Sequence, residues 1–262
     1  MRDCTMLLSS YDGGEDLWDG FFTCFFAEWH NFNMPIVLNT ESKNYSFQGK
    51  EIKTFNLYKP GEKIPWAKRL IEHLKRIDTE FIFFILDDFW LDAPVDVEHF
   101  EKCLSWMREN ADVANISFQR TQGPNINDER FERFEKRPKK AEYKLNCQAA
   151  LWRREKLIDF LRPHENPWEF EKYGSMRATR YNDSFYTLID GAKKVFSYDL
   201  GGVIYKGRWC KRVLLPLVDK HNIVIHSENR GFHEDWINNN EPQKRNLWRG
   251  IKNRINIVRS LI

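Results

Sequence analysis

The sequence contains few cysteines, and no two of them form a C-x-x-C pair. The five thiols are odd in number and widely spread, at Cys4, Cys24, Cys103, Cys147 and Cys210. This distribution argues against a zinc site built from cysteine pairs and against a disulfide framework. We therefore expect reduced, mostly buried thiols, as is typical of a cytoplasmic protein.

Long apolar runs are missing as well. The longest uninterrupted one covers only residues 81–86, whereas a membrane-spanning helix needs about 20 apolar residues. The apolar stretch near residue 1 is too short for the core of a secretory signal peptide. No internal repeat or low-complexity linker divides the chain, so we expect its 262 residues to form essentially one domain.

Charge is unevenly distributed. After Glu241 the sequence has six Lys or Arg residues and no acid, so subtracting these six from the net charge of +3 leaves −3 for the body. A negatively charged body argues against nucleic-acid binding, and the basic tail indicates a partner of its own. The composition, 42% apolar and 30% charged, is that of a globular protein, and the 15% aromatic residues suit core packing better than sugar stacking.

Hydrophobic periodicity predicts alternating strands and helices. Residues 119–140 interrupt the alternation with a charged stretch containing Gly123, Pro124 and Pro138, which indicates a long surface loop. The alternation favours an α/β fold with one mainly parallel sheet flanked by helices. We expect strands at 5–10, 34–39, 52–57, 81–86, 113–118, 143–152, 195–200 and 203–205, and helices at 15–29, 66–77, 95–109, 153–161 and from 164 onward.

Two adjacent carboxylates follow the most apolar of these strands. In the segment FIFFILDDFWLD, residues 81–92, Asp87 and Asp88 stand where the strand should end. Ligands of open α/β sheets bind beyond the carboxyl ends of strands, and two neighbouring aspartates repel each other there unless a cation lies between them. Mg²⁺ or Mn²⁺ would meet this need, since both take carboxylate and phosphate oxygens. Alternatively the pair caps a turn or the next helix, although Asp92 or Asp96 is better placed for that.

The helix, strand and acidic pair between Trp66 and Phe89 resemble a region of the GT-A glycosyltransferases, family-2-like enzymes of bacterial capsule, lipopolysaccharide and exopolysaccharide assembly. The resemblance covers roughly residues 4–210. It implies a GT-A-like (Rossmann-like) domain at residues 1–240 that uses Mn²⁺ or Mg²⁺, held by Asp87 and Asp88. The implied reaction moves a sugar from a nucleoside diphosphate sugar, with a UDP-sugar favoured, to a glycan or lipid-linked acceptor. Asp-Asp-Phe replaces a strict Asp-x-Asp, so which carboxylate binds metal stays open.

The resemblance also implies nucleotide-binding residues. The ends of the first two strands would line the base and ribose, and the helix before the acidic strand would touch the nucleotide. Each assignment has an alternative, because serine and aspartate are ordinary turn residues and Trp66 also begins a core stripe. The residues are Ser9, Tyr11, Asp12, Thr40, Glu41, Trp66 and Arg69.

A second acidic segment, ENPWEFE at residues 165–171, could supply the general base of an inverting transfer. In the resembling enzymes a carboxylate on the acceptor side has this role, and Glu169 and Glu171 lie in the corresponding part of the chain. Glu169 would also complete a capping box with Asn166, so Glu171 is the preferred base. Asp183 is a third candidate. Trp168 suits either a sugar face or the core. The family more often has an acidic doublet where this sequence has Glu-Phe-Glu.

The glycine- and cation-rich segment GGVIYKGRWCKR, residues 201–212, could act on the leaving diphosphate. Lys206 and Arg208 are the expected contacts, with Lys211 and Arg212 nearby. The alternative is a tight turn between late strands followed by a solvated basic helix. His226 and His233 lie where some GT-A enzymes place a metal ligand, although isolated histidines are more often plain surface or core residues.

The tail from residue 241 to 262 predicts a basic amphipathic helix. Apolar residues recur at helical spacing over 246–262, with cations elsewhere around the helix, which suits an anionic membrane surface. Docking on the body or on a second subunit is the alternative. We therefore expect a cytoplasmic protein, with attachment to the inner face of the membrane as an option.

Two rival functions share parts of this pattern. A sugar nucleotidyltransferase would also combine such a sheet with an acidic metal site, but it would need a Gly-rich basic loop after the first strand. The turn here, Tyr11 to Glu15, is acidic and has no lysine. A non-catalytic carbohydrate-binding relative is the second rival, and hydrolysis of nucleotide sugars would distinguish it from an enzyme.

Overall fold

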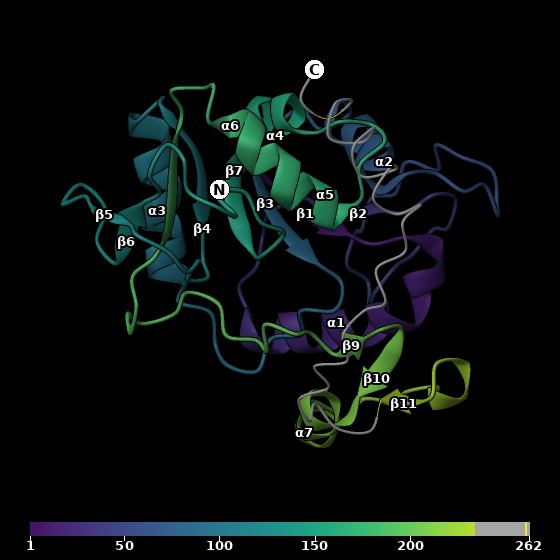
Figure 1. Cartoon of the computed structure of the whole chain (residues 1–262). Coiled ribbons are helices and arrows are strands. Elements are labelled where there is room, and N and C mark those ends of the chain that lie inside the picture. The colour runs from purple at the N-terminus through teal and green to yellow at the C-terminus, as the bar shows by residue number, and fades with distance from the viewer. Residues whose placement is uncertain (234–259, 261–262) are drawn as a thin grey trace, which may run out of the picture.

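The computed structural model describes residues 1–233 and Ser260, which contain a central sheet covered by helices on both faces (Figure 1). In this part of the chain the sheet has eight strands in the order β2-β1-β3-β7-β4-β8-β6-β5. β7 and β6 run against the other strands, so the predicted mainly parallel α/β sheet flanked by helices is confirmed. The strands are β1 (Cys4–Ser9), β2 (Ile36–Asn39), β3 (Phe81–Leu86), β4 (Val113–Ser117), β5 (Ile126–Asn127), β6 (Phe134–Lys136), β7 (Ala150–Arg153) and β8 (Ser184–Leu188).

The central strands are apolar on both faces because each face has its own helices. Successive strand side chains point to opposite faces. Met6 and Phe83, which are paired across β1 and β3, belong to one buried cluster, whereas Leu7 and Phe84 belong to the other. The first cluster includes α1 (Glu15–Glu28) and α3 (Val97–Glu109); the second includes α2 (Trp66–Leu74), α4 (Arg154–Phe160) and α6 (Ser175–Ala178).

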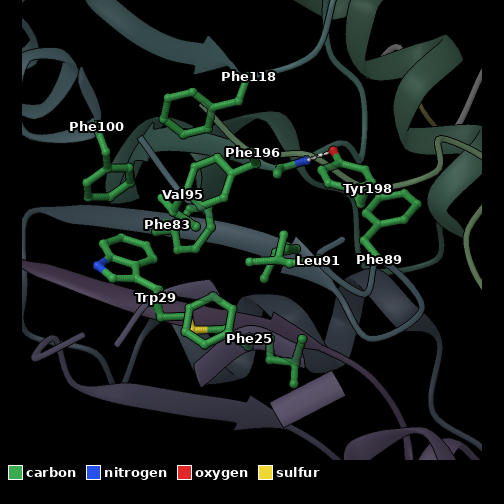
Figure 2. Packing of buried hydrophobic residues seen from close by; sticks show 14 of the residues in the cluster. Phe25, Trp29, Phe83, Phe89, Leu91, Val95, Phe100, Phe118, Phe196 and Tyr198 are labelled. Carbon is green, nitrogen blue, oxygen red and sulfur yellow. Dashed lines mark hydrogen bonds between the residues drawn. The ribbon is translucent and has the colours of Figure 1, made fainter. Parts of the chain in front are cut away.

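Most aromatic residues fill the first cluster. Phe83 stacks on Phe196 with ring centroids 4.7 Å apart, and Trp29 and Phe100 meet the pair edge-on or tilted (Figure 2). These four side chains come from the residue after α1, from α3, from β3 and from the loop before residue 200, so one aromatic cluster joins segments far apart in the sequence. Core packing, as expected from the composition, therefore explains most of the aromatic content.

A small second sheet extends beyond α1 on the side away from α4 to α6 (Figure 1). Its order is β11-β10-β9, and α7 contacts α1. Trp209 packs edge-on against Trp90 at 5.9 Å, which ties this sheet to the main core. The elements are β9 (Ile204–Tyr205), β10 (Arg208–Cys210), β11 (Phe232–His233) and α7 (Lys211–His221).

Residues 143–149 are not the strand that alternation predicts. Tyr143 has a positive φ of 47°, which interrupts extended backbone, and regular pairing begins only at β7. Backbone N–H groups at alternate positions instead donate to side chains: Leu145 to Ser175 (2.9 Å), Cys147 to Glu171 (2.8 Å) and Ala149 to Tyr198 (3.0 Å; dashed in Figure 2). Leu145, Cys147 and Ala149 are buried as the alternation predicts, but Tyr143 is exposed and Lys144 is buried instead, and the hydrogen-bond partners are not a neighbouring strand.

Three other differences concern weak strands. Residues 52–57 and 195–200 each contribute one isolated bridge, Val37 with Lys53 and Ala93 with Ser197. The expected loop at 119–140 contains the short strands β5 and β6, and β8 was not predicted. Short segments such as these depend on partners distant in sequence, so local periodicity identifies them poorly.

All five cysteines are free and buried, as predicted. None of the helices in the described ranges is long and apolar enough to cross a membrane. The expected tail helix at 241–262 and its membrane surface lie outside the described residues, except for Ser260. Ser260 is buried, and its backbone oxygen accepts from Arg177 at 2.7 Å.

Candidate active site

The carboxyl ends of β1 and β3 open into a cleft of about 750 Å³. β1 and β3 are parallel and in register, with Ser9 beside Leu86, so the residues that follow each strand emerge at the same edge. Asp87 and Asp88 line this cleft. Its position beyond the carboxyl ends of the strands is where open α/β sheets bind their ligands. The cleft is also lined by Ser9, Ser10, Tyr11, Trp66, Arg69, Trp168, Glu171, Lys206 and Arg230, among others.

The two aspartates differ in their surroundings. Asp87 is buried, and its Oδ2 accepts from the Ser10 hydroxyl at 2.5 Å. Oδ1 of Asp88 is buried and has no hydrogen-bond partner within the described residues. Burial raises the pKa of both carboxyls, and the charge of Asp87 raises the pKa of Asp88 further. A buried acceptor without a donor is rare in proteins, and it indicates that a positive group belongs at this position.

Neither aspartate caps a helix. The N-cap of α3 is Asp96, whose Oδ1 accepts from the backbone N–H of His99 at 3.3 Å. The main-chain oxygen of Asp88 accepts from Val203 at 2.9 Å, which leaves its side chain for the cleft. The helix cap that the sequence offered as an alternative role for Asp87 and Asp88 is therefore supplied by Asp96, as expected from its position.

Two glycines make room for the carboxylates. A Cβ atom on Gly14 would lie 2.7 Å from Oδ2 of Asp87, and one on Gly202 would lie 2.6 Å from Oδ2 of Asp88. Gly202 also has a φ of +69°, so both space and backbone favour glycine. The loop that carries Gly202 therefore lies directly against Asp88.

The donor set fits a divalent cation. Two carboxylates, one with a buried oxygen lacking a donor, are the hard oxygen ligands that Mg²⁺ and Mn²⁺ prefer. Among the described residues no group of three or more His, Cys, Asp or Glu side chains could hold a metal. His226 instead contacts Glu228 at 3.4 Å, and His233 meets Tyr205 edge-on. Among residues 1–233 and Ser260, the two aspartates therefore have no third protein ligand grouped with them.

Arg69 connects the ends of the two strands. Its guanidinium donates to Asn39 at 2.8 Å and to the carbonyl of Ser10 at 2.6 Å, and it forms a buried ion pair with Glu41. Asp12 completes this frame, because its carboxylate accepts from the backbone N–H groups of residues 41–43. The frame holds the edge of the sheet in one shape.

A smaller cleft of about 450 Å³ adjoins the first. It shares Tyr11, Trp66 and Arg69 with the larger cleft and adds Asp12 and Glu41. The indole N–H of Trp66 donates to Ser9 at 3.0 Å, which fixes the ring between the two spaces. The structure thus brings together six of the seven residues expected near the nucleotide. The seventh, Thr40, is buried, does not line either cleft, and donates to the carbonyl of Lys43 at 3.1 Å.

The candidate bases lie in three different places. Glu171 lines the larger cleft; burial raises its pKa, and its Oε1 accepts from the N–H of Cys147 at 2.8 Å. Glu169 forms the predicted capping box with Asn166 at the start of α5 (Pro167–Glu169) and does not line the cleft. Asp183 pairs with Lys156 at 2.9 Å and is also outside it.

Cations reach the cleft from the small sheet and its connections. Lys206 lines the cleft, whereas Arg208 is exposed on β10 and does not. Arg230, which the sequence analysis missed, also lines it; both of its contacts to Asp16 are 2.6 Å, and it donates to the carbonyl of Gly13 at 2.9 Å. Nothing in the sequence around Arg230 distinguishes it from other surface arginines.

No family model and no curated protein matches the sequence. Among solved structures, the chain is similar to S. aureus TarS at 12% identity and a TM-score of 0.46, covering 75% of this chain and 60% of that one. It is also similar to S. aureus TarS in complex with UDP-GlcNAc, at 11% identity and a TM-score of 0.46, covering 75% of this chain and 58% of that one. The third is the Pyrobaculum calidifontis mannosyltransferase PcManGT in complex with GDP-Man and Mn²⁺, at 11% identity and a TM-score of 0.47, covering 79% of this chain and 59% of that one.

The chain spans about 60% of the length of these solved chains. A likeness at this level of identity and TM-score does not extend to function. The chemistry of the cleft follows from its own side chains.

Proposed function

We propose that this chain is a metal-dependent glycosyltransferase that moves a sugar from a nucleoside diphosphate sugar to a hydroxyl of a glycan acceptor. One observation carries the proposal: Asp87 and Asp88 share a cleft with a third, half-buried carboxylate, Glu171, at the carboxyl edge of the sheet. The pair suits a metal diphosphate, and the third carboxylate suits proton removal from an acceptor. The resemblance of residues 66–89 favours a UDP-sugar and a role in bacterial surface polysaccharide synthesis.

Asp87 and Asp88 would hold Mn²⁺ or Mg²⁺ on the diphosphate. The bound cation would neutralise charge that develops on the leaving diphosphate. Lys206 and Arg230 line the same cleft and would add positive charge beside it. Arg230 is already fixed by Asp16, so little reorganisation is needed when the donor binds.

The smaller cleft would take the base and ribose of the donor. Tyr11 is 46% exposed at the junction of the two clefts and offers a ring face to a base. Ser9 and Trp66 form the wall between the clefts, and Asp12 and Arg69 hold its shape. Thr40 would contribute only indirectly, because its hydroxyl donates to the carbonyl of Lys43, whose own N–H donates to Asp12.

Glu171 would act as the general base of an inverting transfer. The acceptor oxygen attacks the anomeric carbon, the bond from that carbon to the diphosphate oxygen breaks, and Glu171 takes the hydroxyl proton. Because Cys147 engages Oε1, the proton is expected on Oε2. Trp168 is 77% exposed and lines the cleft with Glu171, so it would meet the acceptor. A lipid-linked acceptor would place the enzyme at the inner face of a membrane, through residues 246–262.

The Asp88→Asn variant tests the metal site. It should abolish Mn²⁺-dependent binding of UDP, measured as a thermal shift, together with hydrolysis of UDP-sugars in the absence of acceptor. Asp92→Asn is the matched control, because Asp92 is exposed and outside the cleft. It should behave as the wild type.

Because the donor base is open, GDP, CDP and dTDP and their sugars are assayed alongside UDP. Unchanged metal-dependent binding and turnover in Asp88→Asn would overturn the proposal. Nucleotide-sugar binding without hydrolysis in the wild type would instead indicate a carbohydrate-binding protein.

A further inference from the structure

A buried hydrogen-bond chain ends on the carboxylate of Asp87. The indole N–H of Trp18 donates to Oγ of Ser10 at 2.7 Å, and that hydroxyl donates to Oδ2 of Asp87 at 2.5 Å. Trp18 is fully buried in α1, and Ser10 is 5% exposed. The residue after β1, a residue of α1 and the residue after β3 are therefore joined by one buried hydrogen-bond chain.

The direction of the chain is fixed by the chemistry of its members. An indole N–H can only donate, and a serine hydroxyl has one proton. Since Trp18 occupies an acceptor position of Ser10, the single proton of Ser10 is left for Asp87. The other nearby acceptor, the carbonyl of Tyr11, is 3.4 Å from Oγ, which is too long to compete with 2.5 Å.

Space around this contact is closed to other side chains. A Cβ atom on Gly14 would lie 2.7 Å from Oδ2 of Asp87 and 3.0 Å from Oγ of Ser10. On the main chain, the carbonyl of Asp87 accepts from the indole of Trp90 at 3.1 Å. Both the backbone and the side chain of Asp87 are thus held by buried donors.

We propose that Trp18 and Ser10 are positioning residues, which orient the Asp87 carboxylate for a divalent cation. The inference rests on the proposed function, because it assumes that Asp87 binds the metal. With Oδ2 committed to Ser10, the carboxylate has one rotational setting before the cation arrives. Groups that orient a metal ligand in this way commonly change metal affinity about 10- to 100-fold when removed.

The test measures Mn²⁺ affinity by the electron paramagnetic resonance signal of the free ion. Mn²⁺ is titrated alone and with UDP, GDP, CDP or dTDP, and the nucleotide that gives the tightest binding is used for all variants. Ser10→Ala should weaken Mn²⁺ binding about tenfold. Trp18→Phe keeps an aromatic ring but loses the N–H, so it should weaken binding in the same direction by a smaller factor. In the Ser10→Ala background, Trp18→Phe should have no further effect, because Trp18 acts through Ser10.

Ser184→Ala is the matched control. Ser184 is also buried and donates to a carboxylate, Oδ2 of Asp112, at 2.6 Å, but it lies outside both clefts. It should lower the melting temperature to a similar extent and leave Mn²⁺ affinity unchanged. An equal loss of Mn²⁺ affinity in Ser184→Ala would show that destabilisation alone is responsible and would overturn the inference.

The two proposals fail in different ways. If Asp88→Asn loses Mn²⁺ while Ser10→Ala and Trp18→Phe bind it like the wild type, the positioning role is wrong and the metal site stands. If Asp88→Asn retains Mn²⁺, or the wild type binds none under any of these conditions, the proposed function falls and the positioning role falls with it. Should Ser10→Ala fail to fold, Trp18→Phe alone decides.

Discussion

At the scale of single residues, Glu169 and Glu171 are only two positions apart in the sequence but have different surroundings. Glu169 completes the capping box at the start of α5, with Asn166 donating its N–H to Oε2 of Glu169 at 3.1 Å. Glu171 lies in the π-helical turn Phe170–Gly174, where the chain turns it into the cleft and burial raises its pKa. One carboxylate stabilises the helix start, and the other lines the cleft, where we propose that it takes the acceptor proton.

Glu171→Gln should reduce glycosyl transfer by a factor of about 10² to 10⁴, the range of general base catalysis. The amide has the same shape but does not accept the proton, so Mn²⁺-dependent nucleotide binding should persist. Steady-state transfer kinetics and a thermal shift with nucleotide measure the two properties separately. In the wild type, transfer should rise with pH as Glu171 ionises, with the midpoint above the ordinary range for glutamate because its pKa is raised.

The control for this variant is Glu169→Gln. Glutamine also serves at the third position of a capping box, so the helix start should be retained. The Glu169→Gln variant should therefore transfer sugar at the wild-type rate. Full activity in Glu171→Gln together with loss in Glu169→Gln would move the role to Glu169.

At the scale of elements, α1 packs against the side chain that holds the main chain of Asp87. Gly20 on α1 lies against the ring of Trp90, and the indole of Trp90 donates to the carbonyl of Asp87 at 3.1 Å. Trp90 also packs against Trp209 of the small sheet. The close approach of α1 is possible only because position 20 has no side chain.

Gly20→Ala should destabilise the protein by about 1–3 kcal/mol, because overpacking a dense core forces side chains or backbone to move. The added Cβ would otherwise lie 1.9 Å from Cη2 of Trp90. Urea unfolding followed by circular dichroism measures the change. Thr23→Ala, at a half-buried position of the same helix, should change stability much less. Equal stability of Gly20→Ala and the wild type would show that the ring of Trp90 is free to move.

The elements that the sequence predicts well are those whose signal is local. β1, β3, α1 and α2 were expected within a few residues of their bounds, because each has a continuous apolar run or a helical stripe. The capping box at Asn166 is likewise a pattern of neighbouring residues. The sequence did not predict β8 or the conformation of residues 143–149, because their hydrogen-bond partners come from distant parts of the chain.

At the scale of the whole molecule, one buried histidine links pH to stability. His73 is fully buried in α2; its Nδ1 lies 3.0 Å from the carbonyl of Arg69, and its Nε2 has no partner within the described residues. Burial lowers the pKa of His73 to about 4. The folded protein therefore keeps this imidazole neutral at pH values where the unfolded chain protonates it.

The sign follows from proton uptake. Between about pH 6.5 and 4 the unfolded chain binds a proton at His73 that the folded protein does not, so stability falls as pH is lowered through this window. The expected loss from this one group is about 2–3 kcal/mol between pH 7.5 and 4.5. His73→Leu should remove that part of the decline, as measured by urea unfolding at the two pH values.

His30→Leu is the comparison, because it makes the same substitution at an exposed histidine. Its stability difference between the two pH values should match that of the wild type. An unchanged difference in His73→Leu would show that His73 protonates in the folded protein as easily as in the unfolded chain.

Local patterns of neighbouring residues were enough to predict the α/β class, the strand that presents Asp87 and Asp88, and the segment that contains Glu171. The packing of the folded chain was needed to show that Glu171 lines the cleft at the end of that strand, that Ser10 donates to Asp87, and that Arg230 lines the same cleft. Strand order and register place these residues, and both depend on packing between segments far apart in the chain. Periodicity records which face of an element is buried, but it does not record which element covers that face.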